Sequence, residues 1–131
     1  MARIELRGFY DRFADGEIVA LAKQLAARGV SIDPDEGETE EVAVDLPGVA
    51  VEQLYELLEP HGAAADIYLP VDFAGTLELG ELRIASSRRL SRALRAIRES
   101  LVARQLPLWK RLRYGARQSI ERNLVLDVDR D

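Results

Sequence analysis

The chain has 131 residues, of which 47% are hydrophobic and 31% are charged, and its formal net charge is −5. This size and composition are typical of one folded domain with an apolar core and argue against a disordered chain. Cysteine is absent, which excludes disulfides, thiolate metal sites and a cysteine nucleophile. No secretory signal opens the sequence, and no apolar run reaches the roughly 20 residues that cross a bilayer, so we expect a cytoplasmic protein.

The charges are distributed unevenly along the chain. Residues 83–122 contain twelve basic and two acidic side chains, a net charge of +10, whereas residues 1–82 carry a net charge of −13. Opposite charge on two parts of one chain points to charged partners and says little about the fold.

The first third of the chain contains a predicted strand and a predicted helix. Alternating apolar residues predict a short strand at 4–6, and apolar residues at helical spacing predict a helix over 16–28 that ends at Gly29. The acidic stretch 31–41 follows and is interpreted as a solvated connector, with docking to a basic partner as the alternative. A second strand is predicted at 42–46.

The middle of the chain continues with a helix and more strands. Apolar spacing predicts a helix over 51–58, which Pro60 ends because the residue before a proline avoids the α region. A strand is predicted at 67–71, followed by a return strand over 77–84. The apolar parity of that return strand changes at Gly80, which predicts a β-bulge there.

Two basic helices and a last strand complete the chain. Ser86 or Ser87 can cap the first helix, and Pro107 suits the first turn of the second. Gly115 marks a point where the second helix can break, and a final strand is predicted over 124–128. The predicted buried stripe of the first helix is Leu90, Leu94, Ile97 and Leu101. In the second helix, the residues that repeat at helical spacing are Trp109, Leu112, Ala116 and Ile120.

The predicted order of elements is β-α-β-α-β-β-α-α-β, an α+β fold in which helices pack on a small mixed sheet. Residues 42–105 read β-α-β-β-α, which leans toward a ferredoxin-like core. We expect a single domain over residues 1–131. The second basic helix, 107–122, is expected either to pack on the sheet or to project as a helical appendage.

The sequence contains no catalytic signature. His61 is the only histidine, and its place at the end of a predicted helix favours a capping or surface role over catalysis. The glycines are isolated and form no phosphate-binding loop. The sequence therefore predicts a non-enzymatic protein with no catalytic residue, no metal site and no cofactor.

The arginine-rich helices carry the functional prediction, because guanidinium groups bind carboxylates and phosphates in a bidentate fork. We predict that they bind an acidic protein surface. That surface belongs either to a partner or to a second copy of the chain in a homo-oligomer, with Trp109 or Leu108 as an exposed anchor. The predicted partner-binding residues are Arg88, Arg92, Arg95, Trp109, Arg111, Arg113 and Arg117.

Three alternatives stay open. The same helices can bind nucleic acid, with Trp109 or Tyr114 stacking on a base, although the acidic half of the chain opposes this. Residues 106–114 can lie on an anionic membrane as a peripheral anchor. Finally, the arginines can pair with acidic residues of the protein itself, as a solvated surface of little energetic consequence.

Overall fold

A single mixed sheet runs through the molecule. The computed structural model describes residues 3–34, 40, 41 and 48–130. The strand order is β2-β1-β6-β3-β5-β4, in which β3 and β5 are parallel and all other neighbours are antiparallel. The strands are β1 (Arg3–Arg7), β2 (Glu40–Glu41), β3 (Ile67–Leu69), β4 (Leu77–Leu79), β5 (Leu82–Ser86) and β6 (Val125–Asp129).

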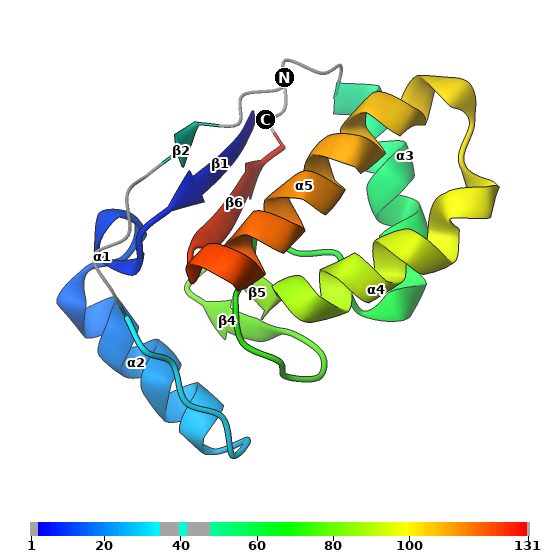
Figure 1. Ribbon diagram of the computed structural model, residues 1–131. Helices are drawn as coiled ribbons and strands as arrows, with labels where there is room; N and C mark the ends of the chain where they lie inside the picture. The colour runs from blue at the N-terminus through cyan, green and yellow to red at the C-terminus, as the bar shows by residue number, and fades with distance from the viewer. Residues whose placement is uncertain (1–2, 35–39, 42–47, 131) are drawn as a thin grey trace.

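Helices lie on both faces of this sheet (Figure 1). On one side α5 lies across β1 and β6 with α4 beside it, and α3 packs against both helices, while α1 and α2 cover part of the other side. The α+β class with a small mixed sheet packed by helices is therefore confirmed. The helices are α1 (Phe9–Arg12), α2 (Asp15–Ala26), α3 (Gly48–Leu58), α4 (Ser87–Ile97) and α5 (Leu106–Arg122), with 3-10 turns η1 (Glu59–His61), η2 (Arg98–Ser100) and η3 (Ala103–Gln105).

The central strands supply two hydrophobic cores. Because successive residues of a strand point to opposite faces, Val125 and Ile67 join the core under α2, whereas Leu126 and Tyr68 join the core under α5. All four side chains are buried. A strand covered on both faces has no polar face, which explains the continuous apolar sequence of β3. The aspartates of β6, Asp127 and Asp129, are only partly buried or exposed.

The local signals in the sequence locate most elements. The helix predicted over 16–28 is α2, and Gly29 beyond its end has φ +74, the left-handed conformation typical of a helix end. The Ser86 hydroxyl accepts two backbone N–H groups of the first turn of α4. Pro107 lies in the first turn of α5. The predictions at 4–6, 51–58, 67–71 and 124–128 correspond to β1, α3, β3 and β6 with slightly shifted bounds.

The prediction of one bulged strand over 77–84 is wrong. Gly80 has φ +61 and lies in a tight turn, so β4 and β5 form an antiparallel hairpin in which Leu79 lies opposite Leu82. β4 is the edge strand, and it is β5 that pairs with β3, in parallel. The strand predicted at 42–46, which begins the ferredoxin-like reading of 42–105, lies outside the described residues.

Helix α5 is continuous and packs on the sheet, so it does not project as an appendage. Gly115 does not break it. A Cβ atom at this position would lie 2.8 Å from Leu126 Cδ1 and 3.7 Å from Ile4 Cγ2, closer to Leu126 than real Cβ contacts come. Glycine here avoids a clash with the buried Leu126 side chain where α5 approaches β1 and β6 closely, a gain that opposes its low helix propensity.

Two buried tyrosines hold the segment before β3. Tyr68 Oη donates to Ala63 O at 2.7 Å and accepts from Ala65 N at 3.0 Å. Tyr55 Oη donates to Ala65 O at 3.0 Å and lies 3.1 Å from Tyr68 Oη. These contacts satisfy backbone groups that do not belong to a helix or a strand, and so fix α3 to the centre of the sheet.

Candidate functional site: an arginine groove between α4 and α5

The structure buries the predicted apolar anchors. Trp109 is 7% exposed and Leu108 is 1% exposed, and the indole Nε1 donates to Leu94 O at 2.7 Å. Trp109 lies on the same helical stripe as buried Leu112 and Ala116, and this spacing is the signal that it belongs to the core. The expectation of an exposed Trp109 or Leu108 is therefore wrong, whereas all six predicted arginines are exposed.

Helices α4 and α5 lie side by side (Figure 1). A groove runs between their outer surfaces. Ser87 Oγ lies 2.7 Å from Ser119 Oγ, and Leu94 contacts Trp109, so the two helices are antiparallel. We call this channel the arginine groove. It consists of two adjoining hollows of about 140 and 470 Å³, which share Arg95 and Arg113. The smaller hollow is also lined by Ser91, Arg117, Ile120 and Glu121. The larger hollow is also lined by Ala96, Arg98, Glu99 and Trp109.

Two of the four groove arginines stack on the buried tryptophan. The guanidinium carbons of Arg98 and Arg113 lie 5.3 and 5.5 Å from the centroid of the Trp109 ring. Cation–π contacts of this kind contribute about 0.5–1 kcal/mol each at exposed sites. The tryptophan therefore orients guanidinium groups at the surface, although it does not itself contact solvent to a significant degree.

The four groove arginines have no carboxylate partner within the described part of the chain. No described Asp or Glu oxygen lies within 4.0 Å of their guanidinium nitrogens, and they donate no hydrogen bond to a described residue. Glu99 and Glu121 line the two ends of the groove without forming such a pair. The groove thus presents a cluster of like charges with free donor capacity, an arrangement suited to an anionic ligand.

The other three predicted arginines lie outside the groove. Arg92 Nη2 lies 3.8 Å from Asp72 Oδ2, while Arg111 lines a separate hollow of about 580 Å³ at the start of α5. Arg88 is exposed in the first turn of α4. Arg92 therefore pairs with an acidic residue of the protein itself, Asp72. Arg89 pairs with the same residue, because its Nε donates to Asp72 Oδ1 at 2.8 Å.

Arg98 belongs to the groove but not to the predicted set. It follows Arg95 by three residues, a spacing that places both side chains on one side of a helix. It lies just beyond the end of α4, in η2, where the chain begins to turn toward α5. The spacing could have indicated this residue; the turn that aims it at Trp109 could not be predicted.

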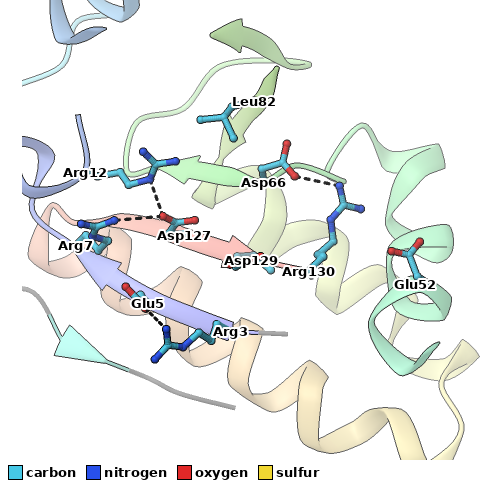
Figure 2. A pocket seen from close by; sticks show the side chains of 11 residues that line it. Arg3, Glu5, Arg7, Arg12, Glu52, Asp66, Leu82, Asp127, Asp129 and Arg130 are labelled. Carbon is cyan, nitrogen blue, oxygen red and sulfur yellow. Dashed lines mark hydrogen bonds and ion pairs between the residues drawn. The ribbon is translucent and has the colours of Figure 1, made fainter. Parts of the chain in front are cut away.

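A larger hollow, about 750 Å³ in volume, lies on the open part of the opposite sheet face (Figure 2). Two ion pairs cross it: Arg12 Nε donates to Asp127 Oδ2 at 2.6 Å, and Arg130 Nη2 donates to Asp66 Oδ1 at 3.1 Å. Burial lowers the pKa of Arg130, but the hydrogen bond to Asp66 and nearby acidic groups raise that pKa by more. A ligand here would have to break existing ion pairs. The remaining lining residues are Arg3, Glu5, Arg7, Glu52, Leu82, Val128 and Asp129.

The described residues lack two other features that would point to a function. In the described ranges, no three Asp, Glu or His side chains are grouped as they would be to hold a metal ion. None of the described helices combines the length and the apolar character needed to cross a membrane. No protein-family model matches the chain, and neither the curated proteins nor the solved structures contain a match to it.

Proposed function

We propose that this chain is a non-enzymatic protein-binding module that holds a short acidic segment of a partner protein in the arginine groove. One observation carries the proposal: four exposed guanidinium groups converge on one channel and have no carboxylate partner among the described residues. Each can donate two parallel hydrogen bonds to a carboxylate, the strongest geometry available to an exposed ion pair.

The stacking on Trp109 supports a recognition role. A long arginine side chain loses conformational freedom when it binds, and that loss weakens binding. Arg98 and Arg113 are already held against the indole ring, so less freedom is lost when a carboxylate arrives. In this proposal Trp109 is a positioning residue and the guanidinium groups make the contact.

The ends of the groove favour a protein segment over nucleic acid. Between Ser91 and Arg98 the groove extends over seven residues of α4, about 10 Å at 1.5 Å per residue. Glu121 and Glu99 line its two ends. A nucleic-acid strand carries a charge at every phosphate and would pass close to these carboxylates, whereas a protein segment with three or four carboxylates ends between them.

Trp109 is the only tryptophan, so its fluorescence reports on the groove. We would titrate the folded chain with a synthetic helical peptide carrying glutamates at i, i+4 and i+7, and separately with a DNA duplex, at low and physiological salt. A saturable change with the peptide is expected, because a carboxylate bound to Arg98 and Arg113 brings negative charge close to the indole ring. Tighter binding of DNA than of peptide, with a steep salt dependence, would instead establish the nucleic-acid alternative.

The variant that tests the groove is Arg95→Glu with Arg117→Glu, which replaces neither of the two arginines that contact Trp109, Arg98 and Arg113. We expect peptide binding to weaken by about tenfold or more, because charge-assisted bonds are lost and repulsion is introduced.

The matched control is Lys23→Glu with Arg104→Glu, which changes the net charge equally at exposed positions outside the groove. Its binding should change by no more than about threefold, because charges beyond the groove act mainly through screened long-range attraction. Equal losses in the two double variants would mean that only net charge matters, and the proposed site would be refuted.

A further inference from the structure

We infer that the ligand of the arginine groove is an acidic helix face, and that helix α3 of a second copy of this chain supplies it. This inference rests on the proposed function, because it names the occupant of the same groove. It predicts that the protein associates with itself, head to tail, through oppositely charged surfaces.

Helix α3 and the turn that follows it carry a row of glutamates, which we call the acidic row: Glu52, Glu56 and Glu59. All three are exposed, and their i, i+4, i+7 spacing places them on one stripe. Glu59 Oε1 lies 3.3 Å from Arg83 Nη1, but both side chains are exposed. An exposed ion pair contributes little stability, so Glu59 can leave Arg83 for another arginine at little cost. Neither a hydrogen bond nor an ion pair to a described residue engages Glu56.

The acidic row and the groove match in length. From Glu52 to Glu59 the row extends over seven residues, about 10 Å if the helical rise is kept. The groove extends over the same number of residues from Ser91 to Arg98. Each of the three carboxylates of the acidic row can therefore contact a guanidinium group of the groove. Charge complementarity then fixes how far the acidic row is shifted along the groove.

Small side chains line part of the groove. Its α4 side includes the small side chains of Ser91 and Ala96, which allow another backbone to approach closely. A helix resting between α4 and α5 would meet Arg95 and Arg98 on one side and Arg113 on the other. This is the ordinary packing of one helix into the channel between two neighbours.

The positions of the two surfaces determine the type of assembly. Glu52 lines the hollow on the open sheet face (Figure 2), whereas the groove lies on the outer surface of α4 and α5, which cover the opposite face. The two surfaces therefore lie on different sides of the molecule, and they do not form a single self-complementary patch. The contact is heterologous, so that α3 of one copy enters the groove of the next and chains of copies grow with concentration.

Sedimentation velocity of the full chain tests this inference. At low salt the weight-average mass should rise above the monomer mass of 14.6 kDa as concentration increases, and it should return to that value at high salt. The variant Glu52→Arg with Glu56→Arg should stay monomeric. The control Glu78→Arg with Glu81→Arg, an equal charge change on the β4–β5 hairpin, should associate like the parent chain.

A charge swap tests whether the two surfaces meet. The acidic-row variant and the groove variant Arg95→Glu with Arg117→Glu should each be monomeric, but their mixture should form complexes, because each supplies a complement to the other. Circular dichroism should show both variants folded. Equal loss of association in the hairpin control, or no complex in the mixture, would overturn the inference.

The two proposals fail separately. A parent chain that stays monomeric at low salt but binds the acidic peptide would refute self-association and leave the proposed function standing. A chain that does neither would refute both.

Discussion

Replacing Tyr68 with phenylalanine removes one buried hydroxyl and no hydrophobic contact. That hydroxyl donates to Ala63 O at 2.7 Å and accepts from Ala65 N at 3.0 Å. Tyr68 is fully buried, so water cannot replace the lost partner. The variant therefore leaves a backbone carbonyl and a backbone N–H without their hydroxyl partner inside the core.

The expected cost follows from the number of orphaned groups. Leaving a buried donor or acceptor unsatisfied costs about 1–3 kcal/mol. Two groups are affected, and rotation of the neighbouring Tyr55 hydroxyl recovers part of the loss, so we expect Tyr68→Phe to lower the free energy of unfolding by about 3 kcal/mol. Tyr55→Phe removes the donor to Ala65 O and the hydroxyl 3.1 Å from Tyr68 Oη, but it orphans one backbone group instead of two and should cost about 1–2 kcal/mol.

Urea denaturation followed by circular dichroism measures both effects. At a slope of about 1.5 kcal/mol per molar urea, the midpoint of Tyr68→Phe should fall by about 2 M. The control is Tyr10→Phe, whose side chain is 52% exposed and whose variant should stay within about 0.5 kcal/mol of the parent. A Tyr68→Phe midpoint close to that of the parent, or a larger loss in Tyr55→Phe, would refute the reasoning.

Two further predictions concern stability. Burial raises the pKa of Tyr68 to about 12, and burial together with Tyr68 raises the pKa of Tyr55. Above pH 10 the unfolded tyrosines ionise while the folded ones stay protonated, so stability present below pH 10 should fall as pH rises toward about 12. Tyr55→Phe should reduce that slope by up to about 1.4 kcal/mol per pH unit in urea titrations. Separately, Trp109→Phe removes the N–H that Leu94 O accepts and should cost about 2 kcal/mol; an unchanged urea midpoint would contradict this.

Part of the site was predictable from the sequence. The basic segment 83–122 and the placement of arginines on helix surfaces follow from composition and periodicity, and Arg95, Arg113 and Arg117 do line the groove. The groove itself is a relation between two helices joined by a turn. Which arginines converge depends on how α4 and α5 are rotated against each other, and local spacing carries no information about that rotation.

The burial of Trp109 shows how a correct pattern led to a wrong interpretation. The spacing of Trp109, Leu112 and Ala116 predicts a buried stripe, and the structure buries all three. The prediction of an exposed anchor rested instead on residue type, because tryptophan and arginine are common at interfaces. Periodicity is the stronger evidence, since it reflects the face that a helix must bury.

Residues within a few positions of one another were enough to predict α2, α3, α4 and α5, the Ser86 cap and the separation of charge, but not the short helix α1. The pairing of β5 with β3 and the hydrogen-bonded cluster of Tyr55 and Tyr68 arise only when the chain packs together. Each of these joins segments well separated along the chain or depends on how separate strands pair. Their formation depends on closing loops and burying apolar area, free energies that are not encoded in any short window of sequence.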